Sequence, residues 1–150
     1  MLKINDKNNM LKLRMGANLS SEITTSQKKN LIINVSPEIE KKKAFIFVQN
    51  FEKGTIHINC FPGSRVLLGD CRQINLKIQA TFQGSKVKIG ARTSINEAKF
   101  WVQKGMITVG EDCMFSEEIH CYSDDEHSIM DLTGVVLNEK KNSINIEKYV

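Results

Sequence analysis

Three histidines, four cysteines and a dense block of carboxylates are the side chains of this 150-residue chain that could perform chemistry. His120 and His127 lie in residues 111–131, a stretch with eight Asp or Glu residues and no Lys or Arg. An imidazole can take a proton from a substrate hydroxyl. In an extended segment Asp125 would share a face with His127 and could orient it. The pair is a candidate for acid–base chemistry, although spacing alone favours an exposed histidine in an acidic loop.

The other candidate groups favour structural roles. His57 and His120 each lie between two apolar residues, so both side chains are expected to point outward from strands. Cys113 has no basic neighbour that would activate its thiol, and it is expected in the core. A metal site built from His120, Cys121 and His127 would match no recognised zinc spacing, so we expect no metal.

Composition indicates a globular protein, with 41% hydrophobic and 25% charged residues. The longest apolar run covers residues 44–48, whereas a membrane-spanning helix needs about 20 residues. The N-terminus has no apolar stretch that resembles a signal peptide. The cysteines form no C-x-x-C pair and are expected to be reduced. We therefore expect a cytoplasmic protein with no transmembrane segment.

The net charge of +4 is unevenly distributed, because residues 1–65 carry +6 and residues 66–150 carry −2. Carboxylates around His127 disfavour a nucleic acid or any other polyanion. We therefore expect no nucleic-acid partner. The basic half leaves a nucleic-acid-binding or surface-binding domain as a weaker alternative.

An internal repeat governs the second half of the chain. The segment GSRVLLGD at 63–70 resembles GSKVKIGA at 84–91, and GMITVGE at 105–111 is a shorter copy. The apolar residue before the second glycine recurs at steps of 21, 20 and 37 residues: Leu68, Ile89, Val109 and Ile146. A period near 20 with short alternating strands predicts a β-solenoid, with a β-sandwich of coincidental spacing as the alternative. The glycines after Leu68, Ile89 and Val109 are expected to form bends that need permissive dihedrals.

The domain organisation follows from where the repeat is visible. Residues 1–53 are expected to form an irregular N-terminal cap or degenerate coils, with a possible short helix around Met10–Met15. Residues 54–150 are expected to form the coils. The 37-residue step predicts a protruding loop at about 121–142.

The repeat and residues 109–131 together resemble the hexapeptide-repeat acyltransferases, most closely the sugar O-acetyltransferases of bacterial capsule and lipopolysaccharide synthesis. That branch reads I-G-x-x-C-M-F-S, then a strand, then S/T-x-D-x-H-x-I-x-D. The matching residues here are Gly110, Cys113, Met114, Phe115, Ser116, Asp125, His127, Ile129 and Asp131. The resemblance implies an all-β fold, a left-handed parallel β-helix with three sides, and assembly into a homotrimer.

The resemblance also implies an acetyl-CoA-dependent transfer to a sugar or glycan hydroxyl, with His127 as general base. It implies acceptor binding by Asp125, Ser116 and Asn138, and leaves the residues that bind acetyl-CoA unknown. Relatives bind most of the acetyl-CoA on coils that follow the position of Val150, so the resemblance indicates a fragment or a truncated product. A catalytically silent solenoid that serves as a binding or assembly module is the alternative.

Overall fold

The structure, a computed structural model, describes residues 2–5, 10–15, 20–25, 29–35, 44–124, 127–137 and 142–150. These residues form twelve strands and no helix, and the strands belong to one sheet. The strands are β1 (Leu2–Asn5), β2 (Met10–Met15), β3 (Ser20–Thr25), β4 (Lys29–Val35), β5 (Ala44–Cys60), β6 (Arg65–Ala80), β7 (Lys86–Ile89), β8 (Ser94–Val102), β9 (Met106–Val109), β10 (Met114–Phe115), β11 (Ile119–Tyr122) and β12 (Ser143–Ile146). Within the described part of the chain, no helical segment is long and apolar enough to cross a membrane.

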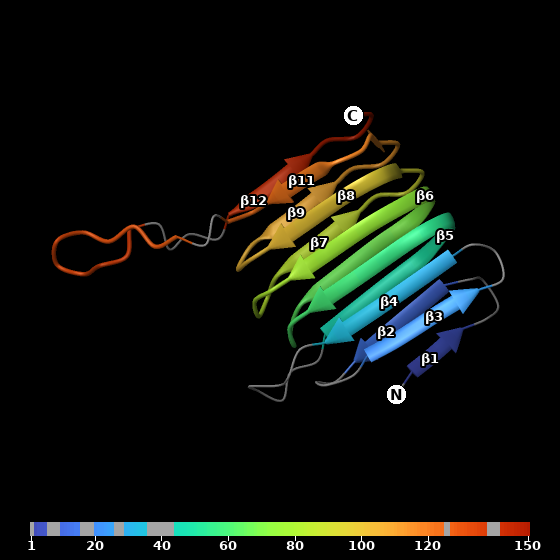
Figure 1. Ribbon diagram of the computed structural model, residues 1–150, viewed down its shortest axis with the longest axis horizontal. Helices are drawn as coiled ribbons and strands as arrows, with labels where there is room; N and C mark the ends of the chain where they lie inside the picture. Colours follow the sequence, from blue (N-terminus) through green and yellow to red (C-terminus); the bar gives the residue numbers. More distant parts are fainter. Residues whose placement is uncertain are drawn as a thin grey trace.

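From β5 onward the strands stack in parallel as a solenoid of about four turns (Figure 1). The register pairs Leu68 with Ile89, Ile89 with Val109, and Val109 with Ile146. These pairs reproduce the predicted steps of 21, 20 and 37 residues. The prediction of an all-β parallel solenoid is therefore confirmed.

Each turn contributes three paired segments. In one turn β7 pairs with β9, the start of β8 pairs with β10, and the rest of β8 pairs with β11. The register between β6 and β8 shifts between Ile74 and Leu76, where β8 holds one additional residue. This bulge lengthens the step between the two coils from 21 residues at Ile74 to 22 residues at Leu76.

The core is a set of apolar ladders that run along the inside of the solenoid. Leu68, Ile74, Ile89, Ile95 and Val109 are each at most 2% exposed. Burying such a side chain contributes about 1.5–3 kcal/mol relative to leaving it exposed. A single turn would leave these side chains open to water, so each turn depends on its neighbours for stability.

The glycines that close the apolar motif play a role different from the expected one. Gly69, Gly90 and Gly110 do not have positive φ, so the expectation of permissive bends there is wrong. A Cβ on Gly90 would instead collide with the Gly110 carbonyl group and lie 2.7 Å from the backbone nitrogen of Glu111. Glycine is therefore required because the backbones of successive coils approach too closely for a side chain.

The left-handed conformation recurs at equivalent corners of the coils, two residues after Gly90, two residues after Gly110, and at Tyr149. Arg92, Asp112 and Tyr149 have φ values of 58°, 57° and 63°. Their spacings of 20 and 37 residues repeat the coil steps. Arg92 also donates hydrogen bonds to Asp112 and Glu111 at 2.7 Å, which raises the pKa of Arg92 and lowers the pKa of Asp112. The carboxylates of Glu111 and Asp112, which belong to the acidic block, thus balance the positive charge of Arg92 on the preceding coil.

The N-terminal strands cover the first coil. β2 pairs antiparallel with the first part of β5, and β4 pairs parallel with its second part. β1 and β3 extend these pairings antiparallel to β2 and β4. The expected helix around Met10–Met15 is wrong, because these residues form β2. The predicted boundary between residues 53 and 54 falls inside β5, and the division into two segments stays a prediction.

Candidate functional site

A long insertion leaves the solenoid between β11 and β12. Figure 1 shows it extending far from the coils, in orange, before the chain returns to pair β12 with β9. The predicted loop over 121–142 is confirmed for its described residues, except that Cys121 and Tyr122 still belong to β11. Its described part, 127–137, contains an isolated antiparallel bridge between Met130 and Val136.

Asp131 organises the tip of this loop. Its Oδ1 accepts hydrogen bonds from the Thr133 backbone nitrogen at 2.8 Å, the Thr133 hydroxyl at 2.7 Å and the Val135 nitrogen at 3.0 Å. These donors, the hydroxyl foremost, lower the pKa of Asp131. Gly134 completes the turn with a φ of 83°. Asp131, the last aspartate of the D-x-H-x-I-x-D pattern, thus holds the loop backbone in place.

The structure places two of the four predicted site residues. His127 is exposed near the start of the described loop, and Ser116 is exposed directly after β10 on the solenoid. In the part of the chain that the structure describes, no hydrogen bond joins their side chains. Asp125 and Asn138 lie outside the described residues. The roles assigned to all four residues stay predictions.

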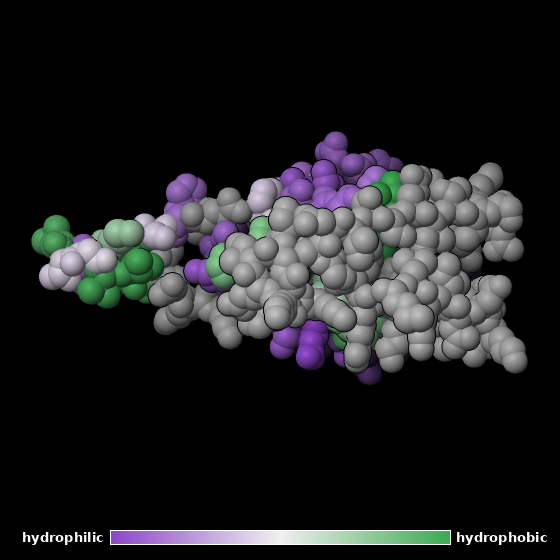
Figure 2. Space-filling model, turned by 90° about the horizontal axis from the view of Figure 1, so that it is seen from below, coloured by the Kyte–Doolittle hydropathy of each residue, from purple (hydrophilic) through white to green (hydrophobic). Residues whose placement is uncertain are grey.

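The tip of the loop is apolar and exposed. Leu132 is 107% exposed, and four further apolar side chains are more than half exposed: Ile129, Met130, Val135 and Leu137. Figure 2 shows hydrophobic side chains gathered at the far end of this protrusion. A contiguous exposed apolar patch marks an interaction surface.

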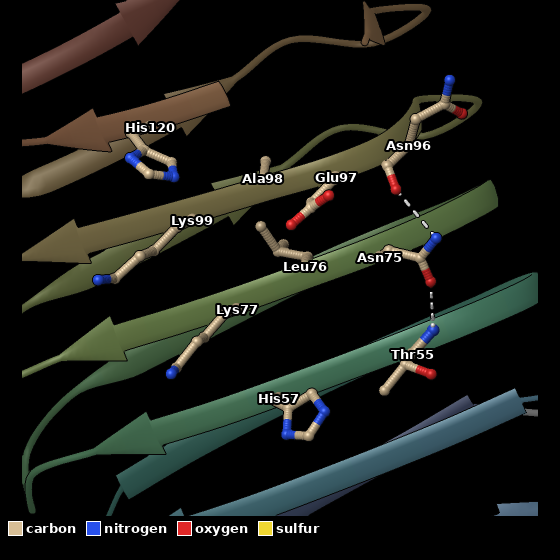
Figure 3. A pocket seen from close by; sticks show the side chains of 10 residues that line it. All are labelled: Thr55, His57, Asn75, Leu76, Lys77, Asn96, Glu97, Ala98, Lys99 and His120. Atoms are coloured by element: carbon tan, nitrogen blue, oxygen red, sulfur yellow. Dashed lines mark hydrogen bonds between the residues drawn. The ribbon is translucent and has the colours of Figure 1, made fainter. Parts of the chain in front are cut away.

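A second feature lies on the outer face of the solenoid, where a hollow of about 430 Å³ crosses β5, β6, β8 and β11 (Figure 3). His57, Lys77, Lys99 and His120 form one column across it, each paired in register with the next. The other residues that line it are Thr55, Asn75, Leu76, Asn96, Glu97 and Ala98. The outward orientation predicted for His57 and His120 is confirmed.

The sequence alone did not identify the two lysines, because only the strand register shows that they lie beside the histidines. The spacings along the column are 20, 22 and 21 residues, close to the coil step. Alignment of the outward positions of successive repeats is the signal that could have revealed the column.

The thiols are structural. Burial raises the pKa of Cys60 to about 12 and that of Cys71 to about 11, and also raises the pKa of half-buried Cys121. Cys113 is 2% exposed, which confirms its predicted place in the core. Across the described ranges, no group of three or more His, Cys, Asp or Glu residues is arranged to hold a metal ion.

No protein-family description matches the chain, and no curated protein matches it. A solved structure that is similar is "Crystal Structure of the polySia specific acetyltransferase NeuO", with 20% sequence identity and a TM-score of 0.46. The match covers 79% of this chain and 56% of that chain, so this chain spans little more than half the length of that acetyltransferase.

Proposed function

We propose that the protein is an acetyl-CoA-dependent O-acetyltransferase that modifies a sugar hydroxyl of a surface polysaccharide or its precursor. The observation that supports this most is the long exposed insertion between β11 and β12 of a parallel solenoid. This insertion carries His127 within the D-x-H-x-I-x-D pattern, which resembles that of sugar O-acetyltransferases. The proposal places the protein in the cytoplasm, where acetyl-CoA is available.

In the proposed reaction the sugar hydroxyl oxygen attacks the carbonyl carbon of the acetyl thioester. The imidazole of His127 takes the hydroxyl proton, a C–O bond forms, and the C–S bond breaks as the CoA thiolate leaves. The proton then passes from the imidazolium to the thiolate. A positioned general base contributes about 10²–10⁴-fold to the rate. Asp125, Ser116 and Asn138 are proposed to hold the acceptor.

The alternative is a catalytically silent solenoid that binds a partner through its coils. The hollow across β5, β6, β8 and β11 favours this alternative, because it offers a binding surface on the coils rather than on the loop. The two functions differ in one observable, which is the release of CoA thiol in the presence of an acceptor.

The test measures CoA thiol release with acetyl-CoA and a panel of capsule-type oligosaccharides, for wild type, His127→Ala and the neighbouring control Ser128→Ala. We expect acceptor-dependent release, a kcat about 10²–10⁴-fold lower in His127→Ala, and no change in Ser128→Ala. His127 is exposed, so its removal leaves packing intact. Equal rates for wild type and His127→Ala would remove the general-base assignment. Absence of release with every acceptor would favour the silent module.

A further inference from the structure

We propose that the outer face of β5, β6, β8 and β11 binds an acidic saccharide, with its carboxylate held between Lys77 and Lys99. Binding itself does not depend on the loop chemistry. The role of this saccharide as the acetyl acceptor rests on the proposed function. The acidic block around His127 disfavours a polyanion at the loop, so the carboxylate is assigned to the two lysines on the coils.

The column geometry carries the proposal. Lys77 pairs in register with Lys99, and neighbouring strands lie about 4.8 Å apart, so the two side chains start within reach of one carboxylate. Figure 3 shows both lysines on the same side of the sheet, with His57 and His120 at the two ends of the row. Buried residues flank each of the two lysines along its strand, which fixes their outward direction.

The charges of the hollow favour an anion of low charge density. Among the described residues neither Lys77 nor Lys99 forms an ion pair with a carboxylate. Glu97 lines the same hollow, and Glu117 and Glu118 are exposed just before β11. These carboxylates disfavour a dense row of phosphates, while the two ammonium groups favour an isolated carboxylate. A sugar acid carries one carboxylate per ring and hydroxyls that Glu97 and the imidazoles can bind.

Two aromatic rings lie next to the lysine column on the same face, on the side nearer the loop. Trp101 and Tyr122 lie two residues beyond Lys99 and His120 on the same face, with ring centroids 5.9 Å apart and planes inclined by 33°. The Lys99 ammonium lies 4.9 Å from the Trp101 ring centroid. Trp101 is held by a hydrogen bond from its Nε1 to the Thr81 hydroxyl at 3.2 Å. A pyranose ring presents C–H groups that pack on such a surface, so the face suits a sugar next to the carboxylate site.

The opposite edge of the hollow is held rigid by amide side chains. Asn75 accepts a hydrogen bond from the Thr55 nitrogen at 3.0 Å and donates one to the Asn96 carbonyl at 2.9 Å, as Figure 3 shows. Gln73 donates to the Asn96 side-chain oxygen at 3.3 Å. A floor that is already fixed costs less ordering on binding. The volume of the hollow, about 430 Å³, lies within the range of small-ligand sites, about 300–1,000 Å³.

The experiment is calorimetric titration of the full chain with trigalacturonic acid and with neutral maltotriose, in the absence of acetyl-CoA. We expect binding of the acid at least tenfold tighter than binding of maltotriose. The double variant Lys77→Gln/Lys99→Gln should lose at least tenfold in affinity, because two charge-assisted hydrogen bonds are removed. The control Lys86→Gln/Lys88→Gln removes the same charge from β7, on another segment of the coil, and should bind as wild type does. Circular dichroism checks that each variant is folded.

Three outcomes would overturn the proposal: equal affinity for the two sugars, undiminished affinity in Lys77→Gln/Lys99→Gln, or tighter binding of an oligouridylate of equal charge. The last would identify a single-stranded nucleic acid, which also uses basic and aromatic side chains. Failure of thiol release would overturn the proposed transfer reaction and leave this binding site untouched. Intact transfer without saccharide binding at the lysines would overturn the binding site and leave the proposed transfer reaction standing.

Discussion

At the scale of single residues, the close approach of successive coils requires a residue without a side chain at position 90. We expect Gly90→Ala to lower the free energy of unfolding by about 1–3 kcal/mol, because its Cβ would meet the backbone of Gly110 and Glu111. Backbone atoms cannot move aside as a flexible side chain can. Urea unfolding followed by circular dichroism measures the difference.

Gly84 provides the matched control for this substitution. It has a φ of 84° and no atom within 4 Å of the point where a Cβ would lie, and asparagine tolerates the left-handed conformation. Gly84→Asn should therefore cost less than Gly90→Ala. A larger loss for Gly84→Asn would contradict the argument that coil contact selects glycine at position 90.

The buried thiols give a second prediction. Cys60 and Cys71, with pKa values raised to about 12 and about 11, stay protonated at pH 8 in the folded chain. Only the thiolate attacks iodoacetamide, so labelling of both should be far slower in the native protein than in urea. The native rate should rise as pH approaches those pKa values. Mass spectrometry of labelled peptides measures this, and equal native and denatured rates at pH 8 would contradict it.

The site could be predicted from sequence only in part. Alternation between apolar neighbours correctly predicted that His57 and His120 point outward. The lysines beside them were missed, because only the strand register shows that they lie next to the histidines. The function of Asp131 was missed as well, since a turn held by one carboxylate depends on local backbone geometry that the pattern does not encode. The proposed role of His127 rests on family resemblance.

At the scale of elements, the loop tip depends on the charge of Asp131. Its pKa is lowered, so the ionised form that accepts three hydrogen bonds is present at neutral pH. The stabilisation is complete above the ordinary aspartate pKa of about 3.9 and is lost as pH falls through the lower folded value. We expect Asp131→Ala to accelerate amide hydrogen exchange at Thr133 and Val135 at neutral pH. Unchanged exchange at both amides would show that the turn does not need the carboxylate.

The coils were predictable because each turn must place an apolar residue and a glycine at the same stacked position. This constraint produced the 21-, 20- and 37-residue steps from Leu68 to Ile146, which the register reproduces. The N-terminal hairpins are not subject to this constraint. β1 pairs with β2 and β3 with β4 in antiparallel hairpins, so their register repeats no coil step. The coil repeat therefore could not predict how these strands pair.

At the scale of the whole molecule, the protruding loop bears on assembly. Its apolar tip would be costly to leave in water, and it extends away from the body that could have covered it (Figure 1). A solenoid with flat sides can pack around a three-fold axis, and each loop can then reach a neighbouring copy. These features agree with the homotrimer that the family resemblance implies, and we propose that the protein assembles in this way.

The homotrimer predicts a specific effect of loop charge. In light scattering coupled to gel filtration, wild type should elute with three times the mass of the chain, whereas Leu132→Asp/Val135→Asp should shift toward monomer. Both side chains are more than half exposed, so the aspartates leave the solenoid core intact and should leave the far-UV spectrum unchanged. Leu132→Met keeps an apolar side chain and should remain trimeric, which separates a charge effect from a loss of shape. A wild-type protein that stays monomeric at every concentration would exclude the trimer. A trimeric Leu132→Asp/Val135→Asp would show that the subunits meet through the coils instead of the loop.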